Sequence, residues 1–90
     1  MVIQAGSTYG RPLMDVEDLP RVFGEVVREL RQHRGISQEN LAVAAGVDRA
    51  YMGGIERGIR NPSLTTIARV ATGLGMPLNE VFKAVEKAQK

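Results

Sequence analysis

The chain has 90 residues, a formal net charge of +2, no cysteine and only 4% aromatic residues. A chain of this length forms one small domain, and the missing cysteines exclude disulfide frameworks and thiolate metal sites. The apolar runs are far shorter than a membrane span, and the first residues lack the basic stretch and apolar core of a secretory signal. We therefore expect a cytoplasmic protein without membrane attachment.

The charges are unevenly distributed along the chain. Residues 49–70 contain four arginines against Glu56 alone, whereas residues 15–18 contain three acidic residues. Nine of the twelve basic residues are arginine, which suits bidentate contacts to phosphate or guanine better than lysine does. Nucleic-acid binding and a merely solvated basic face explain this distribution equally well.

An arm and then a helix are predicted for the first third of the chain. Residues 1–19 show no sustained hydrophobic period and contain Gly6, Gly10 and Pro12, which indicates a flexible N-terminal arm. A helical period begins at Pro20, which suits a first helical position, and is expected to stop at a glycine that follows two basic residues. The buried face of this helix consists of Phe23, Val26, Val27 and Leu30. The glycine that stops the helix is Gly35.

Two short helices joined by a tight turn at Gly46 are predicted next. Ser37 is placed to cap the first helix and Asp48 to cap the second, because both residue types accept hydrogen bonds from the N–H groups of a first turn. Gly46 permits the positive φ of such a turn. Gly58 is expected to end the second helix, which therefore covers about residues 48–57.

The helix over 48–57 has one apolar and one outward side when its residues are placed at about 100° intervals. Met52 and Ile55 turn to the core. Arg49 and Tyr51 lie on opposite flanks. The side chains on the outward side are small and are bordered by arginine, as expected for a helix that lies deep in a groove. Its residues are Ala50, Gly53, Gly54 and Arg57.

Two further helices complete an all-α fold of five helices, with no strand signal. Ser63 is expected to cap the fourth helix, Gly75 to end it, and the fifth to start near Pro77. We expect Val81, Phe82 and Val85 of the fifth helix to exceed what one small core can cover, and therefore predict a homodimer through this helix. The helical domain is predicted over 20–88. The apolar residues of the fifth helix are Leu78, Val81, Phe82 and Val85.

The ordered set of residues resembles the Cro and phage-repressor type of helix-turn-helix, the XRE family, over about residues 21–86. Within this family, the tract over 48–58 is most similar to the small controller proteins of restriction-modification systems. The resemblance implies a five-helix bundle of the lambda-repressor-like DNA-binding type, with the helix over 48–57 in the major groove of double-stranded DNA. The signature is Leu30-Arg31-x-x-Arg34-Gly35-Ile36-Ser37-Gln38-x-x-Leu41-Ala42, then Gly46-Val47, then Ile55-Glu56-Arg57-Gly58-x-Arg60-Asn61-Pro62.

The resemblance also implies roles for the residues at the start of the two short helices. Gln38 holds a DNA phosphate together with the backbone N–H groups of its first turn, or is an exposed first-turn side chain without a binding role. Arg49 reads O6 and N7 of guanine, or contacts a phosphate. Ala50 contacts a thymine methyl group or has no role. Tyr51 contacts a sugar or phosphate, or packs half-buried.

The residues at and after the end of the recognition helix are expected to hold the DNA backbone. Arg57, Arg60 and Asn61 form this clamp, or else a solvated basic turn. Gly53 and Gly54 stand where family members often carry polar side chains that reach base edges. Their expected role is a close approach of the helix backbone to DNA, and the alternative is relaxed specificity or lost DNA binding.

One further residue pair is expected to be structural. The resemblance places Arg31, late in the first helix, against Glu56 near the end of the recognition helix. Such a pair orients the recognition helix if it is partly buried, and removing one partner then costs more than removing both.

We therefore predict a sequence-specific, double-stranded DNA-binding transcriptional regulator of the phage-repressor type that acts on its own operon, as an activator or a repressor. The alternative is an antitoxin of this fold, a protein-interaction module that neutralises a toxin partner. An enzyme is not expected, because His33 is the only histidine and cysteine is missing, which leaves neither a metal site nor a catalytic triad. No cofactor and no small-molecule ligand are expected, because the chain is too short for a separate ligand domain.

Overall fold

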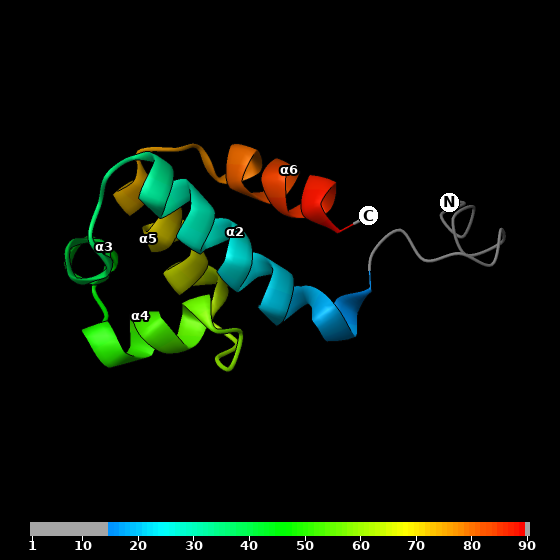
Figure 1. The fold of residues 1–90 in the computed structure, drawn as a ribbon, viewed down its shortest axis with the longest axis horizontal. Helices are drawn as coiled ribbons and strands as arrows, with labels where there is room; N and C mark the ends of the chain where they lie inside the picture. Colours follow the sequence, from blue (N-terminus) through cyan, green and yellow to red (C-terminus); the bar gives the residue numbers. More distant parts are fainter. Residues whose placement is uncertain (1–14, 90) are drawn as a thin grey trace, which may run out of the picture.

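Helix α2 runs through the middle of the molecule, with α6 on one side of it and α4 on the other (Figure 1). The computed structural model describes residues 15–89, which form five α-helices and one 3₁₀ turn without a strand. This confirms the predicted all-α fold. Helix α3 packs against both α4 and α5 and closes the bundle at one end. The elements are η1 (Val16–Asp18), α2 (Leu19–His33), α3 (Gln38–Ala45), α4 (Arg49–Glu56), α5 (Leu64–Leu74) and α6 (Leu78–Ala88).

The N-terminal boundary differs from the arm predicted over 1–19. Residues 16–19 already form η1 and the first residue of α2, and Asp15 caps η1. Asp15 accepts a hydrogen bond from the Glu17 N–H at 3.1 Å, and its own N–H donates to Oε1 of Gln89 at 3.2 Å. The hydrophobic period could not reveal these residues, because polar side-chain contacts order them. Residues 1–14 of the predicted arm lie outside the described part of the chain.

The helix starts and stops follow the predicted capping residues. Ser37, Asp48 and Ser63 each accept a hydrogen bond from the backbone N–H three residues later, at 3.0, 2.7 and 3.1 Å. Gly46 and Gly75 end α3 and α5 with φ angles of 71° and 73°. Only glycine adopts this left-handed conformation without a steric penalty. The predicted turn between α3 and α4 is therefore confirmed.

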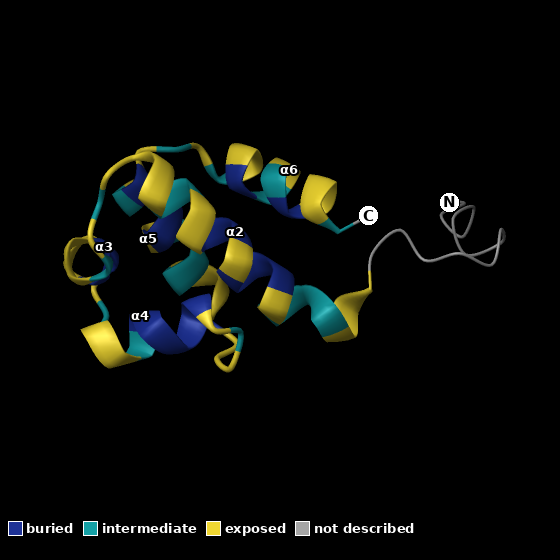
Figure 2. Cartoon of the chain, viewed as in Figure 1, coloured by how far each residue is buried: buried dark blue, intermediate teal, exposed yellow. Residues whose placement is uncertain are grey.

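A single apolar core lies between the helices, and Figure 2 shows buried stretches in dark blue on α2, α4 and α6. Val81 and Val85 of α6 are fully buried in this core. The prediction that these two residues exceed what one core can cover is therefore wrong, because α2 packs along α6 and covers them. Of the three residues on which the dimer argument relied, only Phe82 is left half-buried.

Helices α2 and α4 cross closely at Gly24, a residue to which the sequence motifs assign no role. A Cβ atom at Gly24 would lie 2.2 Å from the carbonyl oxygen of Ile55 and 2.7 Å from that of Glu56. Both oxygens belong to the backbone at the end of α4, so no side-chain rotation relieves the contact. The absence of a side chain at Gly24 therefore sets how α4 lies on the rest of the fold.

Candidate nucleic-acid interface

The start of α3 and the outward side of α4 enclose a shallow hollow of about 270 Å³. It contains two of the predicted DNA-contacting guanidinium groups, those of Arg49 and Arg57, and both side chains are exposed. Ala50 is also exposed. The hollow thus combines positive charge with small residues, as a surface that receives a DNA backbone or base edge requires. Its lining residues are Gln38, Arg49, Ala50, Gly53 and Arg57.

A buried ion pair holds α4 against α2, as predicted. Nε of Arg31 donates to Oε2 of Glu56 at 2.7 Å, and Nη2 donates to Oε1 at 3.0 Å. The two side chains are only 12% and 3% exposed. Hydrogen bonding to Glu56 raises the pKa of Arg31 above its ordinary value. Nη1 of Arg31 donates to the carbonyl oxygen of Ile36 at 2.9 Å, which also ties the loop before α3 to the pair.

Gln38 joins this network through its side chain. Its amide Nε2 donates to Oε1 of Glu56 at 3.0 Å, while its Oε1 lies near Gly53 in the hollow. The Gln38 side chain is therefore held toward α4. In the first turn of α3 the N–H of Asn40 donates to the Ser37 cap, and the N–H groups before it have no carbonyl partner within the helix, as at any helix start.

The two adjacent glycines of α4 are buried beneath arginine side chains. An ideal Cβ at Gly53 would lie 3.0 Å from Nη1 of Arg57. An ideal Cβ at Gly54 would lie 2.7 Å from Cγ of Arg60. The helix backbone at these positions is therefore covered in the free protein, whereas the predicted close approach to DNA needs it to be open.

The remaining predicted residues divide between two places. Tyr51 is half-buried, and its ring lies beneath the guanidinium of Arg60, with Cζ 5.3 Å from the ring centroid. Asn61 is exposed but borders a different, apolar hollow with Pro62 and Phe82. The structure therefore brings Arg60, from the loop after α4, against Tyr51 of that helix and separates Asn61 from the hollow at Arg49.

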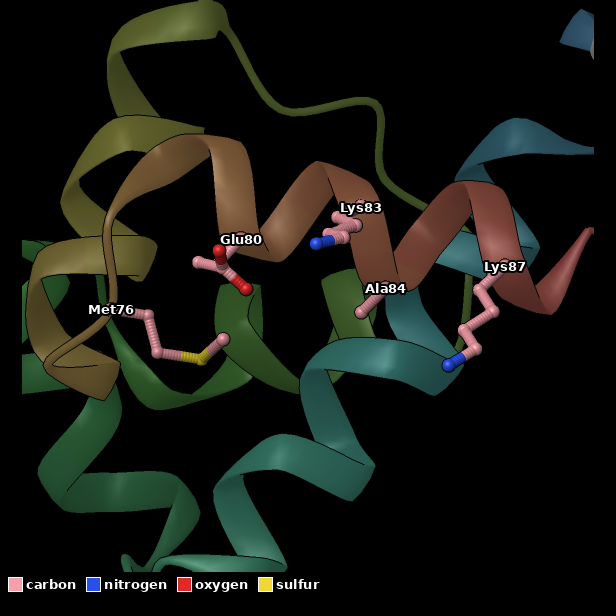
Figure 3. A pocket seen from close by; sticks show the side chains of 5 residues that line it. All are labelled: Met76, Glu80, Lys83, Ala84 and Lys87. Atoms are coloured by element: carbon pink, nitrogen blue, oxygen red, sulfur yellow. The ribbon is translucent and has the colours of Figure 1, made fainter.

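Another hollow, of about 330 Å³, lies along α6 (Figure 3). It combines the acidic Glu80 with Lys83 and Lys87, and Met76 comes from the segment that precedes the helix. Because α6 and α4 pack on different sides of α2, this hollow does not join the arginine-bordered surface (Figure 1). Among residues 15–89 no helix is long and apolar enough to cross a membrane.

Two helices joined by a left-handed glycine turn, with a capped second helix that presents arginines outward, define a helix-turn-helix DNA-binding domain. Residues 22–82 match the family model described as a helix-turn-helix domain. The chain belongs to the helix-turn-helix family and is a DNA-binding transcriptional regulator. The predicted resemblance is confirmed, and the family consists of transcription regulators rather than enzymes.

Several relatives are named as controllers or regulators of transcription. The chain is 37% identical over 73 residues to the control protein C.MunI of Mycoplasma sp, which covers 80% of this chain and 99% of that protein. It is equally identical to the transcriptional regulator SutR of Escherichia coli, but there it spans only 41% of the relative. These regulators do not favour the antitoxin alternative.

Solved structures of restriction-modification controller proteins show the same fold. C.AhdI from Aeromonas hydrophila is 50% identical, with a TM-score of 0.68 over 73% of this chain and 98% of that one. The controller protein C.Esp1396I, solved as a tetramer in complex with its natural 35 base-pair operator, is 30% identical, with a TM-score of 0.73 over 78% of this chain and 92% of that one.

Proposed function

We propose that this chain is a controller protein of a restriction-modification system, which binds a specific double-stranded DNA sequence in the cytoplasm and regulates transcription there. The observation that carries this proposal is the arginine-bordered outward side of α4, held in place by the buried pair of Arg31 and Glu56. The names of the relatives C.MunI and C.AhdI support the restriction-modification role.

The proposed contacts follow from where each side chain lies. Arg49 is the first residue of α4, the end that a recognition helix directs into the major groove, where a guanidinium pairs with O6 and N7 of guanine. Ala50 contacts a thymine methyl group. Arg57 and the first turn of α3 at Gln38 hold phosphates on either side of the hollow. Asn61 contacts the DNA backbone from the loop after α4.

Selection of binding sites from a random duplex library at about 150 mM salt is expected to enrich an inverted repeat. Arg49→Ala is expected to change the selected bases at one position of each half-site and to weaken binding to the original sequence about tenfold or more, because one bidentate pair contributes about 1–3 kcal/mol. Lys87→Ala, which removes one positive charge from α6, should select the original repeat. Failure of the wild-type protein to enrich any sequence would contradict sequence-specific recognition.

A homodimer is the second part of the proposal, because two recognition helices about 34 Å apart read the two halves of an inverted repeat. Leu64 of α5 is 70% exposed, and Ile67, three residues later, lies on the same side of the helix. Ile67 also lines an apolar hollow with Phe23 and Phe82. We propose that this surface, rather than α6 alone, forms the dimer interface.

Light scattering at tens of micromolar is expected to give twice the chain mass of 9.8 kDa for the wild-type protein. Leu64→Glu is expected to give the monomer mass with unchanged helix content, because it places a charge in the interface without touching the buried core. Val43→Glu is the matched control, since Val43 is 75% exposed on α3. A dimer that survives Leu64→Glu would place the interface elsewhere.

A further inference from the structure

We propose that Gly54 and Tyr51 form a seat for Arg60 on the outward side of α4, and that the absence of a side chain at Gly54 places this arginine in the DNA-contacting surface. Both are positioning residues, since they act through Arg60. The inference rests on the proposed DNA-binding function and adds to it how a residue outside the recognition helix becomes part of the recognition surface.

The contacts show that the stem of Arg60 lies across α4 at Gly54. A Cβ at Gly54 would meet three consecutive atoms of that side chain, with Cγ at 2.7 Å, Nε at 3.2 Å and Cδ at 3.5 Å. The guanidinium then continues over the ring of Tyr51, at 5.3 Å from its centroid. Tyr51 and Gly54 are three residues apart, so they are neighbours on the helix surface. Any side chain at residue 54 would occupy the path of the Arg60 stem.

The end of α4 brings Arg60 back along the helix. Gly58 has a φ of 78°, and the N–H of Ile59 donates to the carbonyl oxygen of Gly54 at 3.0 Å. This hydrogen bond is the one that reverses the chain after a helix with a left-handed glycine stop. Arg60 therefore returns beside the turn of α4 that contains Gly54.

The seat prepares Arg60 for an anionic or acceptor-rich partner. A cation over an aromatic ring keeps its N–H groups available at the edge of the guanidinium, and Arg60 remains exposed. A side chain that is already ordered loses less conformational freedom on binding. Residue 54 lies one turn after Ala50 on the outward side, so the Arg60 stem crosses α4 where a side chain of that helix would otherwise face the duplex, and the guanidinium lies beside this position over Tyr51.

The first test measures the affinity of four variants for the duplex that the wild-type protein selects. The variants are Gly54→Ala, Arg60→Ala, the double variant and the control Lys87→Ala. We expect Gly54→Ala and Arg60→Ala to weaken binding about equally, by about tenfold, and the double variant to bind no more weakly than either. The thermal midpoint of Gly54→Ala should not fall, because alanine favours a helix over glycine. If the affinity loss of the double variant equals the product of the two single losses, residue 54 itself contacts the DNA. If Gly54→Ala leaves the affinity unchanged, the seat has no role. Either result overturns the proposal.

The salt dependence of the same binding distinguishes what Arg60 contacts. If the guanidinium holds a phosphate, the slope of log affinity against log salt falls by about one in both single variants. If it reads a base edge, the slope stays and the selected bases change in both. A change in only one of the two variants contradicts the seat.

The second test examines the seat in the free protein and does not depend on DNA. Ring current from Tyr51 should shift the side-chain resonances of Arg60 upfield in the wild-type protein and in Tyr51→Phe, and the shift should vanish in Tyr51→Leu and Gly54→Ala. A wild-type protein without the shift overturns the seat even if DNA is bound. A wild-type protein with the shift that selects no duplex overturns the proposed function and the DNA role of Arg60 with it.

Discussion

Gly24→Ala is expected to lower the free energy of unfolding by about 2–3 kcal/mol, as measured by urea denaturation. A methyl group at this position meets the carbonyl oxygens of Ile55 and Glu56 at 2.2 and 2.7 Å. Because these are backbone atoms, α2 and α4 must separate, and overpacking of this kind costs about 1–3 kcal/mol or more. The separation also moves α4, so DNA binding should weaken further than the loss of folded protein explains.

Gly53→Ala is the matched control for this substitution, because it makes the same chemical change inside a helix. Its Cβ meets only the ends of two flexible side chains, Nη1 of Arg57 at 3.0 Å and Oε1 of Gln38 at 3.5 Å. We expect Gly53→Ala to raise the free energy of unfolding by up to about 1 kcal/mol, since alanine favours helices. Equal effects of Gly24→Ala and Gly53→Ala would contradict the close crossing of α2 and α4.

Glu56→Ala is expected to have the largest effect, a loss of about 3–5 kcal/mol in the free energy of unfolding. The substitution leaves the Arg31 guanidinium buried without its carboxylate, and an uncompensated buried charge is strongly destabilising. It also removes the acceptor of the Gln38 amide. Arg31→Ala should be similarly damaging, whereas the double variant should lose less than the sum of the two, which urea denaturation of all three proteins measures.

The exposed pair of Arg21 and Glu25 provides the control for this experiment. Their side chains are 55% and 61% exposed, and their atoms Nη1 and Oε2 are 2.9 Å apart. Since water and salt screen exposed ion pairs, Glu25→Ala should change stability little, and that change should disappear at high salt. A Glu56→Ala protein as stable as Glu25→Ala would show that the pair at Glu56 does not orient α4.

Much of the candidate site could be predicted because its determinants are local. Asp48 caps α4 as expected, and the spacing from Gly46 places Arg49 at the start of that helix. The side that Met52 and Ile55 turn to the core follows directly from the helical period. The pairing of Arg31 with Glu56 came from the family resemblance, since local spacing does not relate residues on two different helices.

The site could not be predicted where distant residues cover one another. The helical period correctly placed Gly53 and Gly54 on the outward side, but it did not show that Arg57 and Arg60 lie over them. It gave no reason to notice Gly24, whose importance depends on the carbonyl oxygens of another helix.

The amino-acid sequence by itself therefore determined the all-α class, the helix starts and stops and the residue types that face outward from α4. Capping, glycine stops and helical periodicity act within a few residues, so they can be read without a fold. Only the tertiary structure decided that Val81 and Val85 belong to the core of one chain, and that Arg60 crosses Gly54. These outcomes depend on which helices pack together, because burial is set by neighbours that are distant in the chain.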